Sequence, residues 1–207
     1  GGSIPNIRPR DCGATTDIDV PPAVQQATAR IPAVPYSHDV TVEVEELAEG
    51  VYLIGGGTHN SVAVEFEDFV AVVEAPLNQD RSLAVIEEIT RLAPDKPIRY
   101  VVNTHDHYDH IGGARAYTHI GATLVTHRYN DWFYHDELYD RRRWTLAPDL
   151  LSQDMVTEIH EGYIYELVQE NYWITDGDRV LQVNYVGFPL DHAEGMLVAA
   201  LPEEGIL

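Results

Sequence analysis

The chain contains the stretch Thr104-His105-Asp106-His107-Tyr108-Asp109-His110-Ile111-Gly112-Gly113, in which histidine and aspartate follow the order His-x-His-x-Asp-His. A short, largely apolar run, residues 98–102, precedes it, and a glycine pair ends it. This order predicts a strand, a loop and then a helix. Side chains two residues apart on a strand point to the same side, so the end of the strand is expected to place His105 and His107 together.

A tight turn after these residues is expected to bring Asp109 and His110 round to the same point. Imidazole and carboxylate groups are ligands for zinc and similar divalent ions, with zinc–ligand bonds of about 2.0–2.2 Å. The bland alternative is a polar surface loop or a cloning tag, but a tag is a terminal homopolymer and this stretch is interior and mixed. Three histidines and an aspartate in register therefore predict a metal site.

A catalytic metal needs ligands from more than one segment, so that the site is rigid and keeps one open position. His105 and His107 supply two ligands, and His192, in a loop between two expected strands, is the best candidate for the third. Three imidazoles leave the fourth position to a water whose pKa can fall to about 7. Asp109 and His110 then face that water or a second ion, about 3.5–4 Å from the first.

Other titratable residues are expected to support the site or to lie outside it. His59 and His127 are interpreted as surface residues or outer partners rather than as metal ligands. Glu74 ends an expected buried strand beside the motif, where a carboxylate is suited to orienting a ligand histidine through its far ring nitrogen. A plain strand-end carboxylate in water is the alternative. Cys12 is the only cysteine, so no internal disulfide can form and the redox compartment stays open.

Composition narrows the classes of partner. The chain has 207 residues, of which 44% are hydrophobic, and this is typical of a packed globule. Its 34 acidic residues against 13 basic ones give a net charge of −21, which disfavours nucleic acids and anionic membranes as partners. The expected partner is a small-molecule substrate. No apolar run reaches membrane-spanning length. Oligomeric state and compartment (exported, periplasmic or cytoplasmic) are left open.

Periodicity predicts an α/β domain over residues 40–207, preceded by an irregular proline-rich arm over residues 1–39. A helix is expected over residues 81–93, capped by Asn78 or Asp80, and further helical structure over residues 128–140. The interval 145–170 is ambiguous. Strands are expected at residues 40–45, 51–54, 61–66, 69–73, 98–103, 123–126, 172–175, 179–186 and 196–201.

The motif resembles the signature of the metallo-β-lactamase superfamily, and its flanks are similar to the superfamily's broad group of uncharacterised metal-dependent hydrolases. The resemblance covers about residues 40–207. It implies an αββα sandwich, in which two mixed sheets pack face to face with helices outside and metals at one edge, the second sheet being incomplete here. The flanking segments that carry it are Val72-Val-Glu-Ala-Pro76, Asn103-Thr104, Gly121-Ala-Thr-Leu-Val-Thr-His127 and Asp191-His-Ala-Glu-Gly-Met196.

By position, the resemblance implies that His105, His107 and His192 hold a first metal, and that Asp109 and His110 are the first two ligands of a second. Members usually continue into a bridging aspartate and a later histidine, which would lie beyond the end of this sequence. We therefore expect a fragment or a cleaved piece of a longer protein, with a weakly bound second ion.

Two further departures concern single residues. Glu74 stands where many members carry aspartate. Cys12 is far from every motif, so the cysteine ligand of some true β-lactamases has no candidate here, which makes antibiotic hydrolysis a less favoured activity.

The function predicted from these residues is metal-dependent hydrolysis. A metal-bound hydroxide would attack an ester, lactone, amide, thioester or phosphoester, with Asp109 as the catalytic residue that holds or deprotonates the water. Zinc, as one or two ions, is the expected cofactor, and iron or manganese also suits such donors. The alternatives are an iron-dependent redox enzyme on the same fold and a non-catalytic metal-binding fragment.

Overall fold

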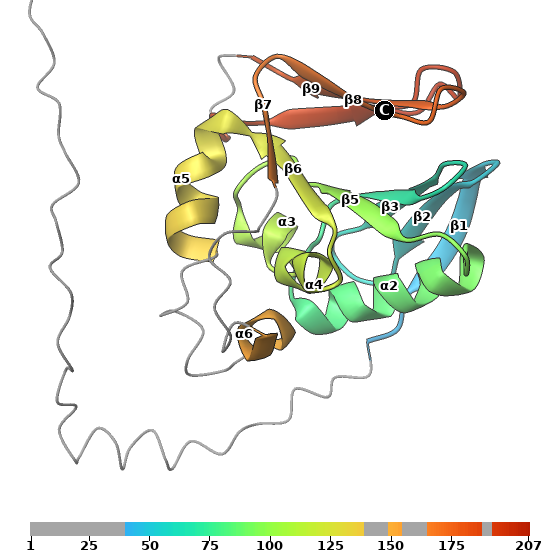
Figure 1. Cartoon of the computed structure of the whole chain (residues 1–207), viewed down its shortest axis with the longest axis horizontal. Helices are drawn as coiled ribbons and strands as arrows, with labels where there is room; N and C mark the ends of the chain where they lie inside the picture. The colour runs from blue at the N-terminus through green and yellow to red at the C-terminus, as the bar shows by residue number, and fades with distance from the viewer. Residues whose placement is uncertain (1–39, 139–148, 155–164, 188–191) are drawn as a thin grey trace, which may run out of the picture. The chain divides into compact units, whose positions relative to one another are not determined.

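The computed structural model describes residues 40–138, 149–154, 165–187 and 192–207, so the expected arm over residues 1–39 lies outside it. These residues form two β-sheets and several helices (Figure 1). The strands are β1 (Glu43–Ala48), β2 (Val51–Gly55), β3 (Ser61–Glu65), β4 (Val70–Val73), β5 (Ile98–Val102), β6 (Thr123–His127), β7 (Tyr165–Val168), β8 (Asn171–Thr175), β9 (Val180–Tyr185) and β10 (Leu197–Ala200). The helices are α2 (Gln79–Leu92), α3 (Tyr108–Ile111), α4 (Ala114–His119), η1 (Arg128–Asn130), α5 (Asp131–Phe133), η2 (Tyr134–Leu138) and α6 (Leu150–Asp154).

The larger sheet has seven strands in sequence order, from β1 to β7. Strands β1 to β4 lie close to four of the predicted strand ranges and form an antiparallel meander. Strands β4 to β7 run parallel to one another. Parallel neighbours need crossover connections, and α2 supplies the one between β4 and β5. The carboxyl ends of β4, β5 and β6 therefore meet at one edge, which is where α/β folds build their sites.

The smaller sheet has the order β10-β9-β8, and both pairs are antiparallel; its three strands lie where strands were predicted, at residues 172–175, 179–186 and 196–201. The turn between β8 and β9 is held by Asp176, whose carboxylate accepts hydrogen bonds from the backbone N–H groups of Asp178 and Arg179. After β10, Leu201 and Ile206 form a single antiparallel bridge. A mixed seven-stranded sheet, an antiparallel three-stranded sheet and helices agree with the predicted fold class.

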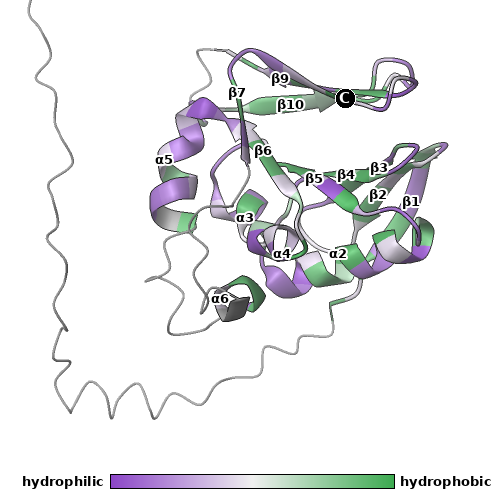
Figure 2. Cartoon of the chain, viewed as in Figure 1, coloured by the Kyte–Doolittle hydropathy of each residue, from purple (hydrophilic) through white to green (hydrophobic). Residues whose placement is uncertain are grey.

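The larger sheet is buried on both faces, and β4 shows how. Val70 and Val72 belong to a core cluster that includes Val85 and Ile89 of α2, whereas Ala71 between them packs in a second cluster with residues of β8, β9 and β10. A strand covered on both faces is apolar throughout, and this explains the uninterrupted run predicted for residues 69–73. In Figure 2 the central strands and β10 are largely green, whereas β1 at the sheet edge is largely purple.

Helix α2 begins at Gln79, earlier than the predicted residue 81, and Asn78, one of the two predicted caps, accepts from the N–H of Arg81 at 3.0 Å. Helical spacing predicts that one apolar stripe of α2 is buried, but the prediction is wrong in part, because only Ile89 is buried among its residues Leu83, Ile86, Ile89 and Leu92. The buried face instead includes Arg81, which donates to the carbonyl of Ile54 at 3.0 Å, and Ser82. Ser82 lies so close to Gly113 that an added Cβ there would be 2.1 Å from the serine Oγ. Close packing against the motif, and not hydrophobicity alone, therefore determines which face of α2 is buried.

Strand β7 was not predicted. It pairs in parallel with β6, and Tyr165 lies opposite Leu124. The strand has four residues, and two adjacent ones, Glu166 and Leu167, are both exposed, so it lacks the alternation that identifies a half-buried strand. Its position is decided by pairing with the edge of β6.

No helix in the described ranges is long and apolar enough to cross a membrane.

Candidate metal centre

The metal-site motif leaves the sheet at the end of β5, which stops at Val102. The prediction that strand alternation pairs the first two histidines is therefore wrong, since His105 and His107 lie in the loop beyond the strand. The buried side chain of Asn103 shapes this loop. Its Nδ2 donates to the carbonyl of His110 at 3.1 Å, and its Oδ1 accepts from the hydroxyl of Tyr134. The loop is thus closed by an internal bridge, and α3 follows it directly.

His105, His107 and His192 form one cluster, in which one ligand nitrogen from each lies within 4.8 Å of the other two. The Nε2 atoms of His105 and His192 are 3.2 Å apart, although 87 residues separate them in the sequence. The backbone N–H of Leu197 donates to the carbonyl of Thr104 at 2.7 Å, which ties the start of β10 to the motif loop. The structure thus brings together the three residues selected for the first ion. Their role as ligands stays a prediction.

Burial sets the charge state of His105. Its side chain is 1% exposed, and burial, together with the neighbouring histidines, lowers the pKa of His105 to about 4. The imidazole is therefore neutral at physiological pH, as a metal ligand must be. Its Nδ1 lies 2.8 Å from the hydroxyl of Thr104, so its Nε2 faces His192.

Asp109 and His110 lie on α3 and form a second cluster with His59. Asp109 Oδ2 lies 3.1 Å from His59 Nε2 and 3.9 Å from His110 Nε2. Desolvation alone would raise the pKa of Asp109, but a backbone hydrogen bond and the neighbouring histidines hold it below its ordinary value. The carboxylate is therefore ionised at neutral pH. Its side chain is half-exposed. Sequence reasoning placed His59 outside the ligand set, because only the tertiary structure brings the β2–β3 loop to α3.

Glu74 connects the two parts of the motif. Its carboxylate accepts from the backbone N–H of Thr104 at 2.8 Å and contacts Nδ1 of His110. This hydrogen bond raises the pKa of His110 above its ordinary value. Glu74 has φ of +72°, a left-handed conformation that costs a residue with a Cβ about 1–3 kcal/mol. The observed contacts thus match the predicted orienting role of Glu74. Glu74 makes them with its own backbone in a strained conformation.

Close backbone contact explains the glycine pair that follows the motif. A Cβ added at Gly112 would lie 2.1 Å from the carbonyl oxygen of Leu77, a distance that no side chain tolerates. The N–H of Gly113 donates to the carbonyl of Ala75 at 2.9 Å, and the N–H of Leu77 donates to the carbonyl of Asp109 at 3.2 Å. The segment after β4 and the segment carrying α3 therefore pack backbone to backbone.

Sequence and structural similarity to known proteins identify the family of this chain. The sequence profile described as the metallo-beta-lactamase superfamily matches residues 28–197. The chain belongs to the metallo-β-lactamase superfamily. Solved structures of metallo-beta-lactamases resemble its fold. A metallo-beta-lactamase from Pontibacter korlensis matches with a TM-score of 0.59 and 16% identity, over 79% of this chain and 68% of that one.

A second solved structure, the metallo-beta-lactamase FIM-1 from Pseudomonas aeruginosa in its mono-zinc form, matches with a TM-score of 0.56 and 20% identity, over 79% of this chain and 66% of that one. A curated relative, a linear primary-alkylsulfatase from a Pseudomonas species, is 30% identical over 71 residues, or 34% of this chain. The chain spans 10% of that relative's length. The structural likenesses, at such low identity, establish the superfamily fold.

The donor set of the first cluster fits the divalent metal that the superfamily implies. Three imidazoles converge, and the most buried of them is held neutral by its low pKa. The Nε2 atoms of His105 and His192 are 3.2 Å apart, so a cation between them could accept a lone pair from each. Three protein ligands would leave the fourth position of a tetrahedral ion open.

His127 lies in neither cluster, and the expectation of a surface position is wrong. Its side chain is buried and stacks on the ring of Tyr185, with a centroid distance of 4.1 Å. Its Nε2 lies 3.0 Å from the carbonyl of Gln169, and burial lowers the pKa of His127. The residue therefore packs the carboxyl end of β6 against the neighbouring strands.

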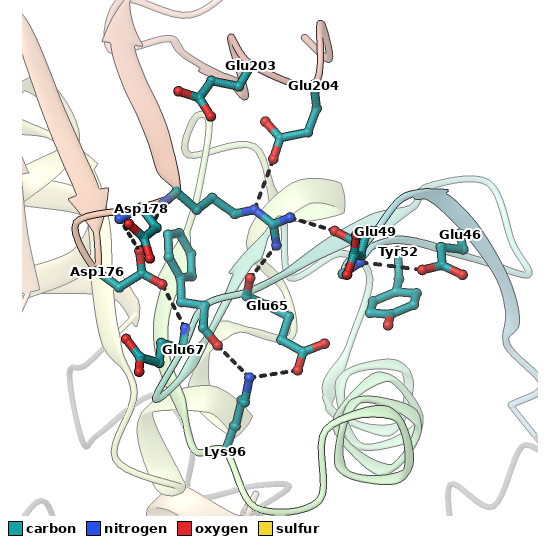
Figure 3. Close-up of a pocket in the computed structure, with 13 residues that line it drawn as sticks. Glu46, Glu49, Tyr52, Glu65, Glu67, Lys96, Asp176, Asp178, Glu203 and Glu204 are labelled. Atoms are coloured by element: carbon teal, nitrogen blue, oxygen red, sulfur yellow. Dashed lines mark hydrogen bonds and ion pairs between the residues drawn. The ribbon is translucent and has the colours of Figure 1, made fainter.

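A separate cavity of about 540 Å³ has no histidine among its lining residues (Figure 3). Most of its lining side chains are acidic, and Arg179 crosses it. The Arg179 guanidinium donates to the carbonyls of Glu49 and Glu65 and, at 2.9 Å, to the carboxylate of Glu204. These contacts join the start of β9 to the β1–β2 and β3–β4 turns. The cavity is thus crossed by a structural link between the two sheets.

Proposed function

We propose that this chain is the metal-dependent hydrolase part of its protein, acting on an ester-like bond of a small molecule. The observation that carries the proposal is the convergence of His105 and His107 with His192 from a distant loop. These three residues would hold the first ion through neutral nitrogens. A bound zinc ion lowers the pKa of water to about 7 and polarises the scissile group.

The protein groups around that position have distinct roles in the proposed reaction. Asp109 belongs to the second cluster, in which the His110 ring lies 4.2 Å from the His105 ring between centroids. Its ionised, half-exposed carboxylate would orient the attacking water and accept its proton. Glu74 holds His110 through Nδ1 and leaves Nε2 facing Asp109. The Thr104 hydroxyl likewise holds His105 through Nδ1 and leaves its Nε2 facing His192. The chain thus positions the reacting groups before substrate arrives, which is how such sites lower a barrier.

The substrate class is proposed as a carboxylic ester, lactone, thioester, amide or phosphoester. The local likeness to a linear primary-alkylsulfatase adds a linear alkyl sulfate to these candidates. A net charge of −21 opposes binding of polyanionic partners, which supports a small, singly charged or neutral substrate.

His107→Ala is the experiment that tests this proposal. Metal content is measured after purification without added metal, and hydrolysis is followed on chromogenic members of each ester class and on an alkyl sulfate. The matched control is His135→Asn, which removes a histidine whose side chain is 75% exposed and pairs with Asp136. We expect His107→Ala to lose both an ion and turnover, and the control to keep both. Equal turnover by His107→Ala and the unmodified chain would refute the mechanism, and iron as the resident ion would favour redox chemistry instead.

A further inference from the structure

The loop between β2 and β3 brings a histidine to the second cluster from outside the motif. We propose that His59 is a metal ligand, which completes a second metal site together with Asp109 and His110. This inference rests on the metal centre of the proposed function. It supplies the third protein ligand that the motif alone lacks, from a segment about 50 residues upstream in the chain.

The distances fit one shared ion. Ligands at about 2.0–2.2 Å from a tetrahedral zinc lie roughly 3.4 Å from one another. Asp109 Oδ2 is 3.1 Å from His59 Nε2 and 3.9 Å from His110 Nε2, and these distances bracket that value. One ligand atom from each residue lies within 4.8 Å of the other two. The same carboxylate oxygen faces both rings, so a single ion between them would contact all three residues.

The far ring nitrogens are held as metal-ligating histidines are held. His59 Nδ1 lies 2.8 Å from the hydroxyl of Thr58, and His110 Nδ1 contacts the Glu74 carboxylate. Such outer partners fix the tautomer and aim the remaining nitrogen at the ion. The Thr58–His59 pair repeats the arrangement of Thr104 and His105 in the first cluster, with the same 2.8 Å separation. Both Thr-His pairs therefore direct Nε2 toward a cluster.

The loop that carries His59 is anchored by its backbone. Gly56 has φ of +103°, and a Cβ there would lie 2.5 Å from the carbonyl oxygen of Thr41. The carbonyl of Ile54, at the end of β2, accepts from the buried Arg81 at 3.0 Å. Only a glycine can make this turn, and the buried arginine fixes where the loop starts. His59 is thus placed over α3 by packing.

The chemistry of the donor set defines the ion. Two imidazoles and one carboxylate form the set used by catalytic zinc sites and by non-haem Fe(II) sites, and both leave positions open. The His59 and Asp109 side chains are 27% and 52% exposed, so an ion can enter from solvent. A single carboxylate gives the site one negative charge, which suits Zn²⁺, Mn²⁺ or Fe²⁺.

The inference is tested by metal stoichiometry on the full chain. The apo-protein is titrated with Zn²⁺ and with Co²⁺, bound metal is measured after dialysis, and the Co²⁺ absorption spectrum reports the ligand set. The variants are His59→Asn and the exposed-histidine control His135→Asn. We expect two ions in the unmodified chain and in the control. His59→Asn should retain one ion and bind the second at least about 100-fold more weakly, because loss of even an outer partner costs about 10–100-fold.

Three other results of this titration would overturn the inference. Two ions bound with unchanged affinity in His59→Asn would mean that His59 only donates a hydrogen bond to Asp109, and would overturn the inference. A single ion whose binding and spectrum are unaffected by His59→Asn would also overturn it, while leaving the proposed function intact. Failure of the unmodified chain to bind any ion would overturn the proposed function and this inference together.

Discussion

Replacing Glu74 with glutamine tests whether the carboxylate behind the motif controls the metal centre. The side chain of Glu74 is 13% exposed and holds two groups, the N–H of Thr104 and Nδ1 of His110. Glutamine keeps the size of the side chain and can still accept from Thr104. It loses the negative charge that makes both hydrogen bonds strong, and its amide group cannot replace a carboxylate opposite His110.

The magnitude follows from these two contacts. A hydrogen bond to a charged group contributes about 1.5–3 kcal/mol, against about 0.5–1.5 kcal/mol for a neutral pair. Weakening both contacts therefore costs about 2 kcal/mol, which for a chain of this length lowers the melting temperature by about 4–8 °C. The positive φ remains in the glutamine variant, so backbone strain is unchanged. Because His110 loses the partner that orients it, metal affinity should also fall by about 10–100-fold.

Two measurements check this prediction in Glu74→Gln. Thermal melts of the apo-protein report the change in stability, and competition with a chromogenic chelator reports the metal dissociation constants. Glu45→Gln is the matched control, since Glu45 is an exposed carboxylate on β1 and its replacement should change stability by less than about 0.5 kcal/mol. Metal affinities in Glu74→Gln that equal those of the control would refute the orienting role. A loss of affinity without any loss of apo-protein stability would refute the energetic reasoning.

Two other predictions concern stability. Asp149→Asn should destabilise the fold by about 3 kcal/mol in urea unfolding at neutral pH, because it removes the carboxylate that pairs with the buried guanidinium of Arg115. Burial alone would raise the pKa of Asp149, but Arg115 and Ser152 hold it below its ordinary value. The stability that ionised Asp149 contributes is present above its unfolded pKa of about 3.9 and is lost as pH falls through its lower folded pKa. The free energy of unfolding of Asp149→Asn should therefore fall less steeply at acidic pH. Arg179→Gln should lower the melting temperature by about 4–8 °C through loss of about 2 kcal/mol of charge-assisted hydrogen bonds, with metal content unchanged. An unaltered melt in either variant would contradict the structural role assigned to its residue.

Local patterns were sufficient for much of the fold. The cap at Asn78 and the uninterrupted apolar run at residues 69–73 were both interpreted from neighbouring residues, and both occur as expected. The motif at residues 104–113 indicated a metal site because so many ligands stand within a few residues of one another. In each case the information is carried by side chains that interact along the chain, over one turn of helix or one length of strand.

Other features depended on contacts between distant segments. Sequence reasoning expected strand alternation to pair His105 and His107, but β5 ends earlier and a bridge through Asn103 shapes the loop. The buried face of α2 was misassigned because Ser82 packs against a glycine pair far along the sequence. Strand β7 has no alternating pattern and is defined by the edge of β6 that it joins.

The amino-acid sequence by itself determined the kind of site this protein has: its ligand types, their spacing and the strand that precedes them. Only the tertiary structure decided which distant side chains reach that site. It brings His192 to within 3.2 Å of His105, and it brings His59, which sequence reasoning had set aside, to Asp109. The physical reason is that spacing along a chain restricts neighbours only, whereas the approach of remote loops is set by backbone contacts and core packing that no local pattern records.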